Sequence, residues 1–295
     1  MILVTSANGN QGKLLVPKLL RAGLEVRACV RTERSAEALR SAGAQHVMVG
    51  DLADRDFIDR AVAGISSLFH IGPTLHPDER PIGFAMVDAA KRSGVRHFVF
   101  SSVLHAITTD LIQHEIKRDI EEDLLSSDLE FTILQPANYM LPLRLKPVFE
   151  EGVFRLTWSL DRHQSMVCLD DVTDVAALVL ANRDDHVAAT YELVGPGRFT
   201  AWDIGSVLSK VVGRPVAVER MAVEDFVRMR HPNCDAETFE QQARLSRAIA
   251  ARYSNHDFLG NPNVLTWLLG RPPTTFEAFA RNEFASFQAA ASAPA

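Results

Sequence analysis

The chain is 295 residues long, which allows one large domain or one domain with a smaller lobe. Its 47% apolar and 23% charged residues are typical of a globular protein, and a net charge of −6 without a basic run argues against nucleic acid as a direct partner. No apolar stretch reaches the roughly 20 residues of a membrane span, so we expect no membrane insertion.

The first thirty residues have the pattern of a strand, a glycine-containing turn, a helix and a second strand. Met1–Thr5 is a short apolar run, the turn 6–12 reads SANGNQG, and residues 13–20 carry apolar side chains at helical spacing. Gly23 ends that helix, and 25–31 is predicted to be the second strand. This order is that of the first βαβ unit of a dinucleotide-binding fold. A glycine pair alone would also suit a tight turn without a ligand, and the flanking elements favour binding.

The turn has the chemistry of a pyrophosphate site. Gly9 lacks a Cβ, so backbone can approach a phosphate closely, and Gly12 allows the helix to pack against the strand. The free amides and the positive dipole end of the helix would face the phosphates. Three side chains in the turn add donors: Asn8, Asn10 and Gln11.

The end of the second strand indicates which dinucleotide is bound. A carboxylate there would bind the ribose 2′-hydroxyl of NAD, but this chain has Arg31, followed by Arg34. Guanidinium groups suit a 2′-phosphate, so we expect NADP(H) as cofactor. Glu33 lies between the two arginines and weakens this preference, and two solvated arginines are the alternative interpretation.

Strands and helices then alternate. Helices are predicted over 35–42, 55–62, 78–93 and 112–127, and strands over 45–49, 67–71, 98–102 and 131–134. The alternation predicts an α/β fold with a doubly wound parallel sheet and helices on both faces. Ligands bind beyond the carboxyl ends of such strands, where the chain places Asp51, Leu52, Gly72, Pro73, Ser101 and Ser102. Asp51 could accept a hydrogen bond from adenine, with Leu52 packing on the ring, or simply cap a helix.

The regular alternation stops after Pro142. Strands are predicted at 164–169, 190–194 and 216–219, helices at 172–181 and 201–212, and mostly helix afterwards. We therefore expect a dinucleotide-binding domain over 1–142, with a contribution from about 165–195, and a small, discontinuous, mixed α/β substrate lobe over 143–290. Residues 288–295 are predicted to be a disordered tail. The composition of the lobe shows no charged cluster that would select an ionic substrate.

Several segments together resemble the NmrA-like branch of the atypical short-chain dehydrogenase/reductases, which have Rossmann folds. The similarity covers nearly the whole chain and is strongest at 4–12, where the family usually reads T-G-A-T-G-x-x-G. It recurs at 94–103, 114–117, 132–138 and 170–176. One departure is Ser6, which stands in place of the first glycine of the loop and would be strained at a positive φ.

The resemblance implies roles for individual residues. The loop from Ser6 to Gly12 would bind pyrophosphate, and Arg31 the 2′-phosphate. Lys117 matches the family lysine that hydrogen-bonds the nicotinamide ribose. The other implied positions are Gly72 and Pro73 in the cofactor groove, Ser101 and Ser102 at the nicotinamide half, and Pro136 and Asn138 near the nicotinamide face.

The catalytic tyrosine of typical short-chain dehydrogenases is missing. Their YxxxK pair donates a proton to the substrate as hydride arrives, but here the residue four before Lys117 is Gln113. Three interpretations follow: an NADPH-dependent reductase of a small electrophile such as a quinone, a non-catalytic NADP(H) sensor that signals to a protein partner, or a binding module without turnover. The first needs a proton source or polarising group, for which Lys117, His114, His105 and Tyr139 are candidates. His114 could equally be a surface residue of its helix, and Tyr139 could pack under the lobe.

The three cysteines, Cys29, Cys168 and Cys234, are far apart and lack the spacing of a zinc site, so neither a metal nor a disulfide framework is expected. Because the amino terminus already reads as a strand, we expect no signal peptide and a reducing cytoplasm as location. The sequence leaves open whether the protein is a monomer or a homodimer.

Overall fold

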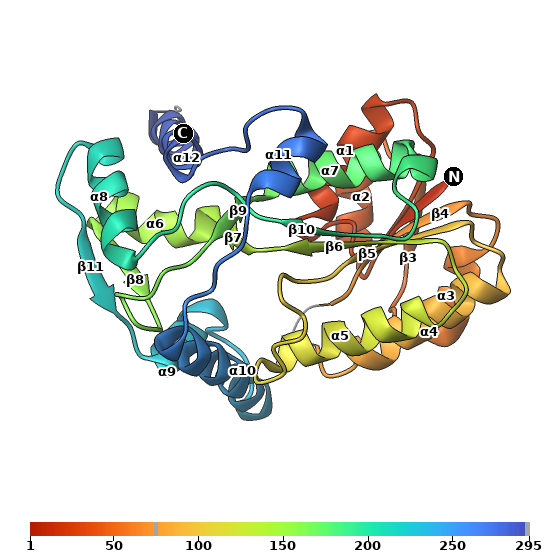
Figure 1. Ribbon diagram of the computed structural model, residues 1–295, viewed down its shortest axis with the longest axis horizontal. Coiled ribbons are helices and arrows are strands. Elements are labelled where there is room, and N and C mark those ends of the chain that lie inside the picture. The colour runs from red at the N-terminus through yellow and green to blue at the C-terminus, as the bar shows by residue number, and fades with distance from the viewer. Residues whose placement is uncertain (74–75, 293–295) are drawn as a thin grey trace.

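The computed structural model describes residues 1–73 and 76–292, and within them seven parallel strands form the central sheet (Figure 1). The order across the sheet is β10-β6-β5-β4-β1-β2-β3. The predicted doubly wound α/β fold is therefore confirmed. The strands are β1 (Ile2–Val4), β2 (Val26–Val30), β3 (His46–Val49), β4 (Ser67–Ile71), β5 (His97–Ser101), β6 (Phe131–Pro136) and β10 (Ala189–Leu193).

Helices cover both faces of this sheet (Figure 1). One face carries α1 (Gly12–Arg21), α2 (Glu33–Ser41), α7 (Leu169–Ala181) and α11 (Asn263–Leu269), and the other carries α3 (Arg55–Val62), α4 (Glu79–Arg92) and α5 (Ile112–Leu125). Because side chains alternate along a strand, Val4 packs with Leu15 in one hydrophobic cluster, whereas Leu3 packs with Phe57 in the other.

The strand order reverses next to β1. Val4 pairs with Ala28 of β2 on one side and with Phe69 of β4 on the other, and the connections leave β1 in opposite directions from there. In open α/β sheets this switch point opens a crevice at the carboxyl ends of the strands, where ligands bind. The glycine turn that follows β1 lies at that crevice.

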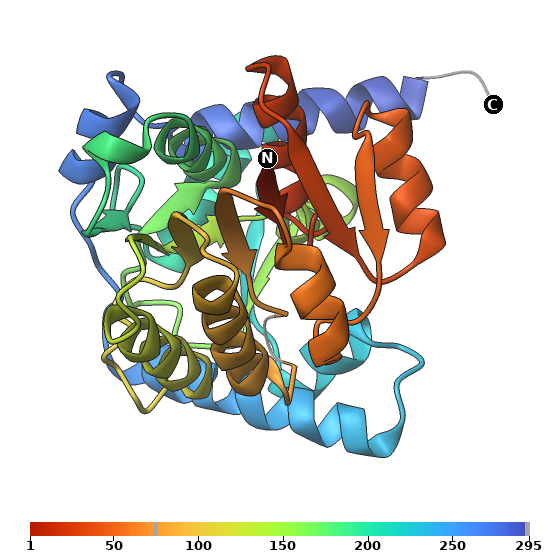
Figure 2. The ribbon, with the colours of Figure 1, turned by 90° about the vertical axis from the view of Figure 1, so that its right-hand side faces the viewer.

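The carboxyl-terminal half forms a lobe beside the sheet. Two small parallel sheets occur in this half of the described chain: β7 (Asn138–Met140) with β9 (Met166–Cys168), and β8 (Val153–Leu156) with β11 (Ala217–Arg220). Figure 2 shows α10 and α12 on opposite sides of the molecule. The helices of the lobe are α6 (Pro142–Glu151), α8 (Ala201–Val212), α9 (Val223–Arg230), α10 (Ala236–Asn255) and α12 (Phe276–Ser292), and a short 3-10 helix, η1, spans Arg183–Asp185.

The lobe differs from the prediction in two places. The residues after Pro142, where the sequence indicated only that the alternation stops, form most of α6 and all of β8, and Pro142 begins α6 at a position that needs no amide donor. α12 continues through Ser292, so 288–292 are helical where a disordered tail was predicted; 293–295 lie outside the described residues. One hydrophobic cluster joins the sheet to the lobe, from Val4 to Phe279, and the division into two domains stays a prediction.

Candidate active site

The glycine turn keeps its shape although a serine replaces the expected glycine. Ser6 has φ 47°, the left-handed conformation that costs a non-glycine residue about 1 kcal/mol or more. Its hydroxyl donates to the carbonyl of Ile71 on β4 at 3.0 Å, and its own carbonyl accepts from the amide of Gly9 at 2.8 Å. These two hydrogen bonds hold Ser6 in a strained conformation. The strain is the one expected for a serine with a positive φ at this position.

The start of α1 has the features of a phosphate site. A Cβ on Gly12 would lie 2.5 Å from the Cα of Ala7, so no side chain fits there. The backbone amides of Asn10, Gln11 and Gly12 donate to no other group of the described chain, and the first turn of α1 contains no acidic residue. Unpaired amides at the positive end of a helix dipole attract anions, so this turn fits a pyrophosphate.

The outer end of the crevice carries exposed basic groups. Arg31 directly follows β2, Arg34 lies in the first turn of α2, and both side chains are exposed. The carboxylate of Glu33, the residue that weakened the NADP preference, is paired with Arg40. Asn8 donates to the hydroxyl of Ser35 at 2.8 Å, which ties the glycine turn to α2.

Asp51 and Leu52 follow β3 at the same edge of the sheet. The Asp51 carboxylate is exposed and accepts from the amide of Ala53 at 2.9 Å within the turn, whereas the cap of α3 is Asp54, which accepts from the amide of Asp56. Leu52 is buried in the hydrophobic cluster that contains Phe57. The Asp51 carboxylate is at the surface, whereas the Leu52 side chain is buried in the hydrophobic core.

Gln11 lies differently from what the sequence suggested. Its side chain is buried, and its amide donates to the hydroxyls of Ser101 and Tyr139, both at 2.8 Å, in place of extending towards a phosphate. Burial raises the pKa of Tyr139, so its hydroxyl keeps its proton at neutral pH. Gln11 thereby joins the turn after β1 to β5 and to β7.

Lys117 forms a buried ion pair that the sequence did not reveal. Its ammonium lies 2.8 Å from the carboxylate of Glu79, and the side chains are only 7% and 0% exposed. It also donates to the carbonyl of Ser101 at 3.2 Å. Gly72 is in contact with both partners, because a Cβ there would lie 2.9 Å from the carboxylate and 3.2 Å from the ammonium. Pro73 follows it, partly buried, before the undescribed residues.

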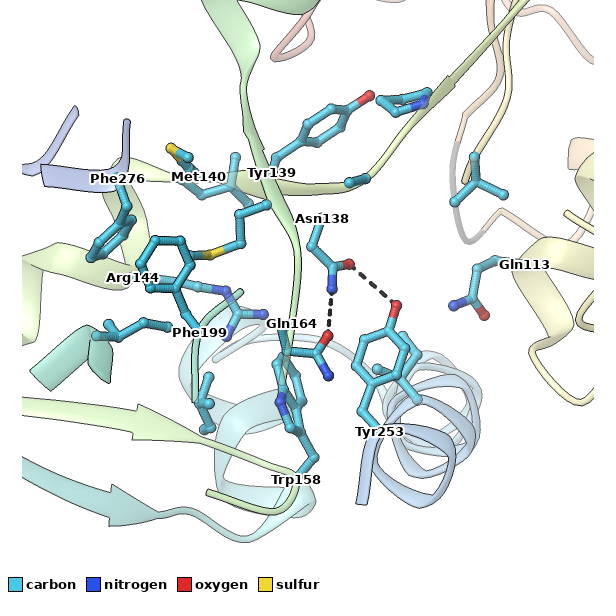
Figure 3. Close-up of a pocket in the computed structure, with 18 of the residues that line it drawn as sticks. Gln113, Asn138, Tyr139, Met140, Arg144, Trp158, Gln164, Phe199, Tyr253 and Phe276 are labelled. Carbon is cyan, nitrogen blue, oxygen red and sulfur yellow. Dashed lines mark hydrogen bonds between the residues drawn. The ribbon is translucent and has the colours of Figure 1, made fainter. Parts of the chain in front are cut away.

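A cavity of about 340 Å³ opens beside these groups (Figure 3). Its end nearest the sheet is lined by Gln11, Ser101, Ser102, Lys117, Pro136 and Tyr139. The lobe supplies an apolar wall that includes Leu145, Phe154, Leu156, Phe199, Ile204, Phe276 and Phe279. The pocket therefore joins the predicted nicotinamide end of the crevice to an apolar space under the lobe.

His114 lines the pocket and is buried. Its Nδ1 lies 3.0 Å from the carbonyl of His105, so Nδ1 carries the proton and Nε2 is left as an acceptor. Burial lowers the pKa of His114, which keeps the ring neutral. The ring of His105 packs edge-on against Phe258 and is not among the lining residues. A neutral His114 in this tautomer can accept a hydrogen bond but cannot supply a proton from Nε2.

The remaining predicted residues also reach the pocket. Ser102 lines it, but its hydroxyl donates to Glu121. Asn138 donates to Gln164 at 2.9 Å and accepts from Tyr253 at 3.2 Å, as the dashed lines of Figure 3 show. Three further residues of this region were not predicted from the sequence: Glu79, Arg144 and Gln164. Glu79 looks like an ordinary acidic residue at a helix start, and neither Arg144 nor Gln164 belongs to a motif.

No helix in residues 1–73 and 76–292 is long and apolar enough to cross a membrane. Within the same residues, no three His, Cys, Asp or Glu side chains are grouped as a metal ion would require.

Comparison with known proteins identifies the family. The model of the NmrA-like family matches residues 1–259. The chain belongs to the NmrA-like family. It is 28% identical to an NAD(P)H azoreductase of Xenophilus azovorans, over 98% of this chain and 100% of that one. It is 30% identical to a (4-alkanoyl-5-oxo-2,5-dihydrofuran-3-yl)methyl phosphate reductase of Streptomyces griseus, over 84% of this chain and 87% of that one.

Solved structures of this family share the fold. The NADPH complex of the Escherichia coli quinone oxidoreductase QOR2 superposes with a TM-score of 0.80 at 24% identity, over 98% of this chain and 100% of that one. The negative transcriptional regulator NmrA superposes with a TM-score of 0.80 at 16% identity, over 99% of this chain and 98% of that one. Relatives thus include both reductases and a regulator, and the nicotinamide dinucleotides named for them agree with the predicted cofactor.

Proposed function

We propose that the protein is an NADPH-dependent reductase of a small, flat electrophile such as a quinone. The observation that carries this proposal is the open apolar pocket beside Gln11, Ser101 and Pro136. A reductase needs space at this place for an acceptor, whereas a sensor could fill it with its own side chains. The names of relatives that reduce azo compounds and quinones support the same reaction class.

NADPH is the proposed cofactor because the two ends of the crevice suit it. The amides at the start of α1 would hold the pyrophosphate, and Arg31 with Arg34 would hold the 2′-phosphate. Glu33 does not compete, because its carboxylate is paired with Arg40. Bound NADPH would supply the hydride.

The side chains at the pocket floor would position the acceptor and supply its proton. Tyr139 lines the pocket and its hydroxyl is oriented by Gln11, so we assign it as proton donor. Lys117, held in place by Glu79, would donate a hydrogen bond to the nicotinamide ribose. His114, fixed as an acceptor at Nε2, would orient a donor group of the ligand.

The alternative is a non-catalytic NADP(H) sensor, which the likeness to NmrA keeps open. The two can be distinguished by filling the pocket. Ile249 lines it from α10 and is partly exposed, so Ile249→Trp should block the acceptor without touching the cofactor crevice. For a reductase we expect unchanged NADPH affinity and at least about a 10-fold fall in kcat/KM for naphthoquinone. A protein that binds NADPH tightly and reduces none of a panel of quinones, azo dyes and aldehydes would be a sensor.

A further inference from the structure

Arg144 is a cation without an anionic partner in the pocket wall. It lies on α6 and lines the pocket, and its guanidinium forms no hydrogen bond or ion pair with any group of the described chain. Its guanidinium instead lies over aromatic rings, 5.2 Å from the centroid of Trp158 and 5.8 Å from that of Phe226. Burial, together with the nearby charge of Arg230, lowers the pKa of Arg144 to about 10, so it stays charged at neutral pH.

Two further donors beside Arg144 lack acceptors. Gln164 and Trp158 are only 4% and 7% exposed, and neither the Gln164 Nε2 nor the Trp158 Nε1 has a hydrogen-bond partner within the described residues. The orientation of Gln164 is set by its neighbour, because its carbonyl oxygen accepts from Asn138. Figure 3 shows Arg144, Gln164 and Trp158 close together on the lobe side of the pocket. Buried donors without acceptors are rare, since each costs about 1–3 kcal/mol.

The charge of the pocket is one-sided. Among the described residues that line it, none is Asp or Glu, whereas Lys117, Arg144 and Arg162 are basic. Lys117 is neutralised by Glu79, and Arg162 is exposed and lies 3.8 Å from Asp257. Among the described basic residues that line the pocket, Arg144 is therefore the one whose charge is not compensated. The composition of the lobe had suggested no selection for an ionic substrate.

We propose that the acceptor carries an oxyanion, best a carboxylate, that binds Arg144, Gln164 Nε2 and Trp158 Nε1 while its flat body extends towards Ser101. A planar guanidinium can pair with a carboxylate through two parallel hydrogen bonds, and that of Arg144 lies over the Trp158 ring, 5.2 Å from its centroid. A substrate anion would thus satisfy three donors that the protein leaves unpaired. That the bound anion is the molecule that is reduced rests on the proposed reductase function, but anion binding itself can be tested without turnover.

The kinetic test compares a quinone carboxylate with its methyl ester. Unaltered protein should reduce the acid with a kcat/KM at least about 30 times that of the ester. Arg144→Met should lower the kcat/KM for the acid about 100-fold, because a desolvated charge pair is lost, and the kcat/KM for the ester less than about 3-fold. Arg144→Lys should retain part of the preference. Arg155→Met is the control, because Arg155 lies on the neighbouring β8, outside the pocket, in an exposed pair with Glu219. Equal rates for acid and ester in unaltered protein would overturn the inference and leave the reductase proposal standing.

The binding test uses 2-naphthoate, which cannot be reduced by NADPH, with its methyl ester, 2-naphthalenesulfonate and 2-naphthyl phosphate as comparison probes. Calorimetry on the NADPH-bound protein should show that naphthoate binds at least about 30 times more tightly than the ester, and that Arg144→Met removes this difference while NADPH affinity is unchanged. The sulfonate and phosphate identify which oxyanion fits best. If Arg144→Met loses naphthoate binding but the unaltered protein reduces no acceptor, the anion site is supported and the reductase proposal is contradicted. Equal binding of naphthoate and its ester by the unaltered protein would contradict the anion site.

Discussion

Replacing Lys117 by Met should destabilise the whole protein, because it leaves the Glu79 carboxylate buried without its cation. The two charged atoms are 2.8 Å apart. At an effective dielectric constant of about 20, this distance corresponds to an attraction of about 6 kcal/mol, much of which only offsets the desolvation of both groups. Removing one partner loses the attraction and keeps the desolvation of the other. We therefore expect Lys117→Met to lower the free energy of unfolding by about 3–5 kcal/mol, although Glu79 keeps its other contacts.

A double-mutant cycle measures this coupling. Urea unfolding followed by circular dichroism would be compared for unaltered protein, Lys117→Met, Glu79→Gln and the double variant. The double variant should recover most of the stability, because it contains no unpaired buried charge. Lys91→Met is a matched control, since Lys91 pairs with Asp128 at 3.6 Å on the surface, with side chains 56% and 93% exposed, and it should leave stability unchanged.

A loss of less than about 1 kcal/mol in the free energy of unfolding of Lys117→Met would contradict a strongly coupled ion pair, as would losses of the two single variants that simply added in the double variant. The cycle also decides how activity data are interpreted. A fall in turnover of Lys117→Met reports on ribose binding only if the double variant, which folds, shows the same fall.

Three further predictions concern the turn, the pocket floor and pH. Gly12→Ala would place a Cβ 2.5 Å from the Cα of Ala7, so we expect NADPH affinity, measured by fluorescence titration, to fall at least about 10-fold; unchanged affinity would contradict the geometry of the turn. Tyr139→Phe should lower kcat about 100-fold with little change in NADPH affinity, and an unchanged kcat would remove Tyr139 as proton donor. Burial lowers the pKa of His70 to about 3 and that of His97 to about 4, so both are neutral in the folded protein while they titrate near 6.5 when unfolded. The unfolded state then binds more protons below pH 6.5, and the free energy of unfolding should be fully retained above that pH and fall towards pH 4 by up to about 1.4 kcal/mol per pH unit for each histidine. A flat profile in urea titrations between pH 6.5 and 4.5 would show that these rings are not held neutral.

The sequence predicted the first half of the chain well because each βαβ unit has a local pattern. Residues 1–136 alternate between short apolar strands and amphipathic helices, and glycines such as Gly23 and Gly94 end helices in the left-handed conformation. Such signals depend on neighbours in the chain, so no knowledge of the tertiary structure is needed to find them.

The second half of the chain was predicted less completely, because the same residues there favour both a helix and a break in the helix, and because its strands pair with partners distant in the sequence. Proline breaks the interior of a helix but is favoured at its first position, and α6 begins at Pro142. Gly152, with φ 75°, ends α6 in the usual way, but Pro147 inside the helix obscured the pattern. β8 then pairs with β11, more than sixty residues later, a contact that no local pattern reveals.

The site was predicted as a set of positions but not as a set of contacts. Lys117, Ser101, Pro136 and Tyr139 do line one pocket, as expected from strand ends and from the family resemblance. The partners of these residues come from elsewhere in the chain: Glu79 lies 38 positions before Lys117, and Gln11 lies 128 before Tyr139. Arg144 is the clearest case, because a lone arginine in a mixed sequence becomes significant only when the structure shows that no group in residues 1–73 and 76–292 pairs with its guanidinium.

We propose above all that an acceptor is reduced in this pocket with electrons from NADPH. The most direct test is the loss of NADPH absorbance in the presence of quinone and azo acceptors, with the affinities of NADPH and NADH measured on the same protein. We expect turnover with at least one flat acceptor, tighter binding of NADPH than of NADH, and a smaller difference between the two affinities in Arg31→Ala. Tight NADPH binding with no turnover on any acceptor would contradict the reductase function, and failure to bind either dinucleotide would contradict the cofactor site as well.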